Sequence, residues 1–201
     1  MVINESKFKV TKLQNDYIFH GELGEKIQET IESFEIELNG KVIPIKPVRN
    51  LGGHNINPYH IHGGKFIPMI KTNDMTKMEE GEIYAVETFV TTGSGVVKEM
   101  EPTSHYMKNT DHHYVDLKMK SYKKLLNYIN NTYNTLPFCD KWISMYSDNK
   151  NPQIILNKLS ELGIVKKYPP LYDVKNSYVA QYEHTLILKS NCKEVLSKCS
   201  D

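Results

Sequence analysis

Three side chains that can bind a metal ion lie far apart in the sequence, at His54, Glu87 and Glu183. Each lies in a stretch whose composition predicts a strand or the edge of one. One imidazole and two carboxylates form a hard donor set of nitrogen and oxygen, which suits a catalytic divalent cation better than a structural zinc ion. These residues therefore predict most of a metal site.

The combination of the three residues matters more than any one of them. A single glutamate on a strand face is more often an edge residue or half of an ion pair than a metal ligand. Here His54 follows two glycines, which let a backbone approach a ligand closely. Each glutamate shares its strand face with apolar residues, where a carboxylate needs a partner. Together they strengthen the case for a metal site, while side-chain chemistry alone does not decide between a metal site and three separate surface positions.

The other histidines give weaker indications. His62, eight residues after His54, fits a third ligand, a general acid or a hydrogen-bonded core histidine, because sequence spacing does not choose among them. His105 has less support than His62. His184 follows Glu183 directly, and side chains alternate along a strand, so we expect His184 to face the other way and to be structural.

The composition limits the class of protein. The chain has 201 residues, 39% of them apolar, which suffices for one domain or a domain with an inserted subdomain. A net charge of +1 provides no basic face, so we expect no direct binding of nucleic acid. The three cysteines form no CxxC pair, and no apolar run approaches the length of a membrane span. We expect a soluble cytoplasmic protein with reduced thiols.

The first part of the chain predicts a helix, a hairpin and a loop. Apolar residues recur at helical spacing over residues 24–34. Two alternating runs at residues 35–38 and 41–48 flank Asn39-Gly40, which is the strongest two-residue hairpin signal. Residues 50–64 are rich in glycine and histidine and predict an irregular functional loop on a rigid frame.

Strands are expected at residues 65–70, 82–91 and 177–188, where β-branched and aromatic residues are frequent. Glu87 should share one face of its strand with three apolar residues, because side chains alternate. Glu183 should occupy the same kind of position on the last strand. Two carboxylates are therefore expected on strand faces that are otherwise mostly apolar.

A helical region is predicted between residues 121 and 163. One helix is marked by the apolar residues of 125–133, and a second by those of 138–146. A third should open with Asn151 as its cap and Pro152 at its first position, and end at Gly163. A short strand at Ile164-Val165 follows. The pattern indicates a helical subdomain that interrupts a sheet protein.

Six segments in order resemble methionine aminopeptidase type 2, and the resemblance extends from about Gly21 to the C-terminus. The segments are Lys46 to His54, Tyr59 to Lys65, Met78 to Phe89, Ser104 to Asn109, Tyr168 to Leu171 and Ala180 to Thr185. The resemblance implies an α/β (α+β) pita-bread fold, of which residues 21–201 are the C-terminal part. It also implies that the helical insertion of the type 2 enzymes lies at about residues 118–166.

The resemblance further implies removal of the initiator methionine from nascent proteins by two divalent metal ions, of Co, Mn, Fe or Zn. His54 and Glu87 would be terminal ligands of one ion, and Glu183 would bridge both. His62 would contact the scissile amide and help to stabilise the developing oxyanion. The pocket for the methionine side chain would be lined by Ile61, His105 and Tyr168.

The chain departs from the family pattern in its first part. The family supplies two further metal ligands, both aspartates, upstream of the position of His54. Residues 1–20 resemble nothing in the family, and Asp16 is their single aspartate. We expect the N-terminal half of the fold to be absent, so that the chain is a fragment of a longer gene product or one half of a split enzyme. Expected partners are the N-terminal methionine of nascent polypeptides, the ribosome and a complementary N-terminal half.

The alternative is a homologue without catalytic activity that associates with a peptide, the ribosome or nucleic acid. The two missing aspartates favour this alternative. The presence of His54, Glu87, Glu183 and His62 argues against it.

Overall fold

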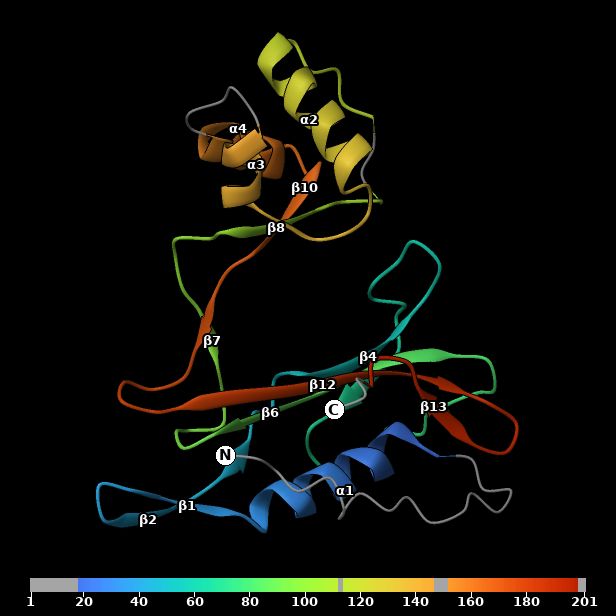
Figure 1. The fold of residues 1–201 in the computed structure, drawn as a ribbon, viewed down its shortest axis with the longest axis vertical. Coiled ribbons are helices and arrows are strands. Elements are labelled where there is room, and N and C mark those ends of the chain that lie inside the picture. The colour runs from blue at the N-terminus through green and yellow to red at the C-terminus, as the bar shows by residue number, and fades with distance from the viewer. Residues whose placement is uncertain (1–17, 112–113, 147–151, 199–201) are drawn as a thin grey trace. The chain divides into compact units, whose positions relative to one another are not determined.

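The computed structural model describes residues 18–111, 114–146 and 152–198, which form two compact units. The first unit contains the residues up to Asn57, His62–Val96 and the residues from Asp173 onward, and the second contains Pro58–Ile61 and Val97–Tyr172. Each unit has a hydrophobic core of its own. The ribbon is shown in Figure 1. None of the helices in the described ranges has the length and apolar character that crossing a membrane requires.

The first unit is built on an antiparallel sheet of six strands. Its order is β13-β12-β6-β4-β5, and β3 also pairs with β6. The bounds are β3 Lys46–Pro47, β4 Gly52–Ile56, β5 Phe66–Pro68, β6 Ile83–Thr91, β12 Val179–Leu188 and β13 Lys193–Val195. The strands expected at residues 65–70, 82–91 and 177–188 are thus confirmed, as β5, β6 and β12.

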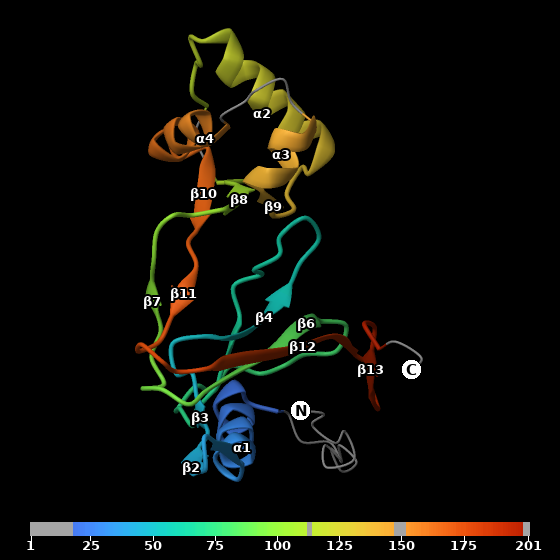
Figure 2. The same cartoon turned by 60° about the vertical axis from the view of Figure 1, so that its left-hand side comes forward.

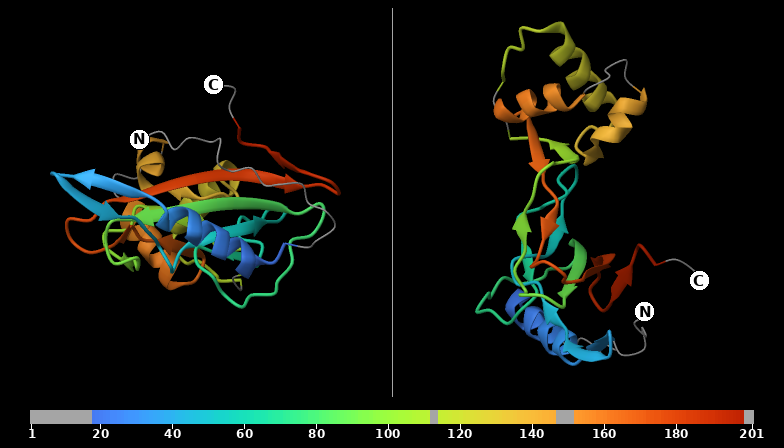
Figure 3. Two further views of the ribbon diagram at one scale, coloured as in Figure 1. Left: turned by 90° about the horizontal axis from the view of Figure 1, so that it is seen from below. Right: turned by 90° about the vertical axis from the view of Figure 1, so that its left-hand side faces the viewer.

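One face of this sheet packs against helix α1, which runs over His20–Glu32. Ile27 and Ile31 of α1 join Tyr84 of β6 and Leu186 of β12 in the core, and Tyr84 and Leu186 are register partners. The left view of Figure 3 shows α1 in front of the strands of this sheet. Because side chains alternate, the residues between these core positions on β6 and β12 lie on the opposite face.

Helix α1 begins four residues before the predicted start at Gly24. The predicted start was too late. Gly21 has a low helix propensity and therefore did not indicate that the helix extends upstream of Gly24. In the structure, a Cβ atom on Gly21 would come within 2.3 Å of the carbonyl oxygen of Thr72, and one on Gly24 within 2.3 Å of that of Ile70. The glycines therefore allow the helix to pack closely on the chain that follows β5.

The predicted hairpin is confirmed, with β1 at Glu35–Leu38 and β2 at Lys41–Pro44. Asn39 and Gly40 have φ angles of 52° and 73°, as a two-residue turn of type I′ requires. The expected run of residues 41–48 is nevertheless two strands. Ile45 is buried and its N–H donates to the carbonyl of Phe34, so the chain leaves the hairpin and β3 joins the main sheet.

The loop predicted at residues 50–64 contains strand β4, which pairs with β5 on one side and β6 on the other. Composition indicated a loop because glycines weaken strands. Here the absence of Cβ atoms permits close pairing. A Cβ on Gly52 would lie 2.1 Å from the carbonyl oxygen of Ile67, and one on Gly53 would lie 2.5 Å from that of Ala85.

The second unit combines helices with a sheet of order β10-β8-β9 and a separate pair of strands, β11 and β7. Figure 2 shows β7 and β11 side by side. The strands are β7 Lys98–Glu99, β8 His105–Lys108, β9 Phe138–Cys139, β10 Val165–Tyr168 and β11 Leu171–Tyr172. The helices are α2 Lys120–Thr132, α3 Asp140–Tyr146 and α4 Pro152–Glu161.

The predicted helices are present, but Phe138 belongs to β9 and not to the second helix. Its ring is buried and stacks on that of Tyr106, its register partner, with 6.1 Å between the ring centroids. A tertiary contact thus overrides the helical spacing of the apolar residues. Pro152 opens α4 and Gly163 follows its end with φ of 73°, whereas the predicted cap Asn151 lies outside the described residues.

A buried carboxylate joins the segment before β12 to the loop after β6. Asp173 is 5% exposed and accepts hydrogen bonds from the hydroxyl groups of Thr91 and Ser94, at 2.8 and 2.5 Å. It also accepts bonds from the backbone N–H groups of Ser94, Gly95 and Val174. Burial alone would raise the pKa of Asp173, but the bonds from Ser94 and Thr91 hold it well below its usual range.

We expect Asp173→Asn to lower the free energy of unfolding at pH 7 by about 2 kcal/mol, since hydrogen bonds to a charged group contribute roughly 1.5–3 kcal/mol. A depressed pKa stabilises the fold above the unfolded pKa of 3.8, and this contribution is lost as the pH falls. The difference between parent and variant should therefore shrink below about pH 4. Urea unfolding at several pH values measures it.

Asp111→Asn is the matched control, because the Asp111 side chain is 76% exposed and its contact with Lys166 is 3.8 Å long. Exposed pairs contribute roughly 0–1 kcal/mol. An equal loss in both variants, or a loss in Asp173→Asn that does not change with pH, would contradict this account of Asp173.

Candidate functional site

Strand pairing brings the three sequence-predicted metal ligands to one face of the first unit's sheet. Glu183 of β12 and Glu87 of β6 are register partners, so they lie directly opposite each other. His54 of β4 is the partner of Ala85, two residues before Glu87 on the same face of β6. This face is opposite to the one that packs on α1. Glu87 and Glu183, which are far apart in the sequence, thus become direct neighbours on paired strands.

His54 and Glu87 form an ion pair. The distance from His54 Nε2 to Glu87 Oε1 is 3.1 Å, and the two side chains are 14% and 15% exposed. His54 Nδ1 lies 3.2 Å from the backbone carbonyl oxygen of Asn55, to which it donates. The hydrogen bond to Glu87 raises the pKa of His54, although partial burial opposes this. Both ring nitrogens therefore act as donors when the ring is protonated.

Glu87 and Glu183 are linked by the amide of Gln181. Gln181 Nε2 donates to Glu87 Oε2 at 3.0 Å and to Glu183 Oε2 at 3.3 Å. Glu183 lies at the surface, yet partial desolvation and repulsion from Glu87 raise the pKa of its carboxyl group, while His54 has the opposite effect. The site is therefore acidic, with one imidazole and one amide to offset the charge.

His62 lies beside His54, with 4.3 Å between the ring centroids and 54° between the ring planes. Two bonds close the base of the loop that carries it. The N–H of Gly63 donates to the carbonyl of Asn55 at 2.8 Å, and the N–H of Lys65 donates to Asn55 Oδ1 at 2.8 Å. His62 is exposed, which excludes the core-histidine interpretation.

Of the residues predicted to line the methionine pocket, two meet in the second unit. His105 of β8 and Tyr168 of β10 are register partners. Tyr168 is half-buried, and its hydroxyl group lies 3.9 Å from the sulfur of Met107. Burial raises the pKa of Tyr168. Ile61, also half-buried, ends the short segment Pro58–Ile61 that is grouped with this unit.

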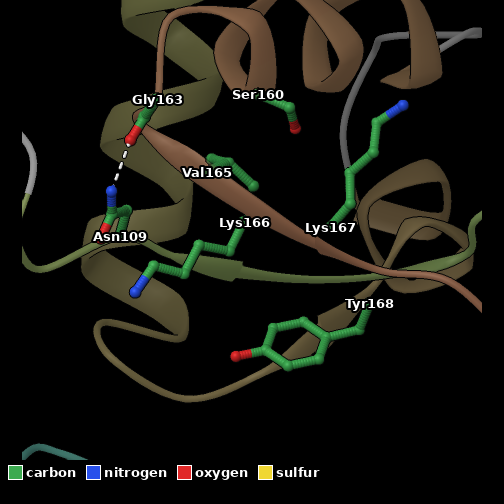
Figure 4. Close-up of a pocket in the computed structure, with 7 residues that line it drawn as sticks. All are labelled: Asn109, Ser160, Gly163, Val165, Lys166, Lys167 and Tyr168. Carbon is green, nitrogen blue, oxygen red and sulfur yellow. Dashed lines mark hydrogen bonds between the residues drawn. The ribbon is translucent and has the colours of Figure 1, made fainter.

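Tyr168 also lines an open cavity of about 520 Å³ in the second unit. Figure 4 shows its lining, in which Asn109 donates to the carbonyl of Gly163 at 2.8 Å. The other lining residues are Ser160, Val165, Lys166 and Lys167. With two lysines and neither His105 nor Ile61 in its lining, this cavity differs from the apolar floor that a thioether side chain prefers.

The donor set fits a divalent cation in part. Adjacent ligands with bonds of roughly 2.1 Å to one ion lie about 3 Å apart at right angles, and His54 Nε2 and Glu87 Oε1 are 3.1 Å apart. Within the described part of the chain, however, no group of three or more His, Cys, Asp or Glu side chains is arranged to hold a metal ion. The spacing of His54 and Glu87 is thus compatible with one cation, and Glu183 does not complete a group of three with them.

His184 lies on the other face from Glu183, as alternation predicts. Its Nε2 lies 2.8 Å from the hydroxyl group of Tyr182, and its Nδ1 lies 2.9 Å from that of Ser197. Sequence reasoning missed Gln181 and Asn55, which bond to the site residues or to the loop that carries them. Alternation could have identified Gln181, because it precedes Glu183 by two residues and shares its face.

The fold belongs to the class of pita-bread proteins, as predicted. A solved structure of a thermophilic Arx1 matches 78% of this chain and 42% of that chain, with a TM-score of 0.66 and 17% identity. At this identity the likeness establishes the fold alone. No family model matches the sequence.

Similar sequences indicate the family, which the structural match does not. The chain is 50% identical over 181 residues to methionine aminopeptidase 2-1 of Fusarium vanettenii, which covers 90% of this chain and 40% of that protein. It is also 50% identical over 202 residues to methionine aminopeptidase 2 of Dictyostelium discoideum, covering 97% and 46%. The chain is therefore a homologue of methionine aminopeptidase 2, and the resemblance of its motifs is confirmed. It spans less than half the length of these relatives.

We expect Glu87→Gln to lower the pKa of His54 in protein kept free of metal by a chelator, because the hydrogen bond to Glu87 is the main cause of the raised value. A raised pKa means that the ion pair stabilises the fold below the unfolded pKa of His and that this contribution is lost as the pH rises through the folded value. Titration of the His54 ring protons by NMR measures the shift.

Glu183→Gln is the control for this titration. Glu183 acts on His54 through space only and contributes least among the causes of its shift, so its replacement should lower the pKa of His54 less. Equal shifts in the two variants would contradict the assignment of the ion pair.

Proposed function

We propose that this chain carries part of the active site of a methionine aminopeptidase, a metal-dependent hydrolase that removes the N-terminal methionine of nascent polypeptides. One observation carries the proposal: His54, Glu87 and Glu183 lie on one sheet face, with His62 beside His54, in a chain about half identical to methionine aminopeptidase 2. We propose the cytoplasm as its location and the ribosome as a partner.

His54 and Glu87 would hold one divalent metal ion and Glu183 would bridge to a second, with Co, Mn, Fe and Zn all compatible with the donor types. Metal ions at such a site polarise a carbonyl group and lower the pKa of bound water. Two ions need more donors than these three residues supply. We propose that further carboxylates, on a complementary N-terminal half, complete the site, and that the isolated chain lacks full activity.

His62 would act on the substrate. Its ring is exposed beside His54, so an N–H of the ring can donate to the oxygen of the scissile amide as negative charge develops there. One such donor contributes about 10²-fold or more in rate. Ile61, His105 and Tyr168 would line the pocket for the methionine side chain, a role supported by the pairing of His105 with Tyr168.

A second candidate is a homologue without catalytic activity that binds a peptide, the ribosome or nucleic acid. One observation favours it: the described residues hold no assembled group of three potential metal ligands. The two candidates differ in metal uptake and in the release of methionine.

We expect calorimetric titration with Co²⁺ or Mn²⁺ to show uptake by the parent chain and a loss of at least about 10-fold in affinity in Glu87→Ala, because a ligand is removed. Methionine release from a Met-Ala peptide should appear when the chain is mixed with the portion of the Dictyostelium discoideum relative that lies outside the alignment. In that mixture, His62→Ala should lower kcat by about 10²-fold.

His184→Ala is the control, because this histidine lies on the other sheet face. Its rate should equal that of the parent. Uptake of metal without methionine release in any mixture would favour the non-catalytic candidate, and no uptake at all would exclude the metal site.

A further inference from the structure

We propose that Gln181 is a positioning residue that holds Glu87 and Glu183 side by side, ready to share a divalent cation. The inference rests on the proposed function, because it concerns the same two carboxylates. Gln181 is not one of the proposed metal ligands, but we expect it to raise the affinity of the site for metal.

The contacts of Gln181 connect two strands. Its Nε2 atom carries two hydrogens, and the two acceptors at 3.0 and 3.3 Å belong to Glu87 on β6 and Glu183 on β12. Gln181 precedes Glu183 by two residues, so their side chains emerge from the same face. Its own register partner is Phe89, two residues after Glu87. The amide thus reaches diagonally across the strand pair.

The choice of oxygen atoms leaves the carboxylates free to bind a cation. Gln181 bonds to Oε2 of Glu87, whereas Oε1 of Glu87 is the atom that faces His54 Nε2. On Glu183 the amide also uses Oε2 only. Each carboxylate therefore keeps one oxygen that the amide does not occupy, and the amide fixes its rotation without competing for that oxygen.

The electrostatics of the site explain why such a bond matters. Like charges directly opposite each other on paired strands destabilise the pairing. A neutral donor between Glu87 and Glu183 offsets part of this repulsion before any cation is present. Without it, the side chain of Glu183 would be free to turn away from Glu87 into solvent, and a cation would have to restore its orientation. Groups that orient metal ligands in this way contribute about 10–100-fold to metal affinity.

The test compares the parent with Gln181→Leu, which keeps the approximate size but removes the donor, and with Gln181→Asn, whose shorter amide cannot reach both carboxylates. Tyr182→Phe is the matched control, because it changes the neighbouring residue on the other face. Calorimetric titration with Mn²⁺ gives the Kd, the visible spectrum of bound Co²⁺ reports ligand geometry, and urea unfolding of metal-free protein reports stability.

We expect Kd to rise by at least about 10-fold in Gln181→Leu and in Gln181→Asn, with an altered Co²⁺ spectrum and a urea midpoint that falls only slightly, because the two lost hydrogen bonds are at the surface. Tyr182→Phe should match the parent. An unchanged Kd in both Gln181 variants, with or without a change in the urea midpoint, would overturn the inference. The proposed function would not be affected by that result. If the parent binds no metal, the proposed function and the inference both fail.

Discussion

The pairing of β12 with β6 is the constraint on which the rest of the site depends. The register runs from Val179 opposite Thr91 to Ile187 opposite Ile83 and sets Glu183 against Glu87. The side-chain period of a strand is two, so a slip of one residue would move Glu183 to the face of α1 and bring Leu186 out of the core. The burial of Leu186 and Tyr84 against α1 therefore specifies the positions of the carboxylates on the other face.

The ends of this strand pair are fixed by different means. Near the start of β12, Asp173 binds the Thr91–Gly95 segment through hydrogen bonds to a buried charge. Beyond the site, Leu186 to Leu188 pair with β13. Between these two anchors β12 has β6 as its strand partner in the described sheet, and the acidic residues lie in this middle stretch. The two ends of β12 are thus held in place by residues that are not candidate metal ligands.

Local patterns were sufficient to predict β6, β12 and the Asn39-Gly40 hairpin, because alternation and turn chemistry are properties of short segments. The motifs also identified the family and its fold. Strand β4 and the place of Phe138 in β9 could not be predicted, since both depend on partners remote in sequence. Alternation places Gln181 on the face of Glu183, but its acceptors lie on two strands. Its role follows only once the register is known.

The close approach of β4 to β6 at Gly53 has a consequence for how functional residues are recognised. A methyl group there would lie 2.5 Å from the carbonyl oxygen of Ala85, and a shift of about 1 Å to relieve the clash would carry His54 beyond hydrogen-bonding distance of Glu87. Gly53 has no side chain that could act as a donor, an acceptor or a charge. The distance between His54 and Glu87 nevertheless depends on the absence of a Cβ atom at Gly53. A search for functional residues by side-chain chemistry alone would therefore not identify Gly53.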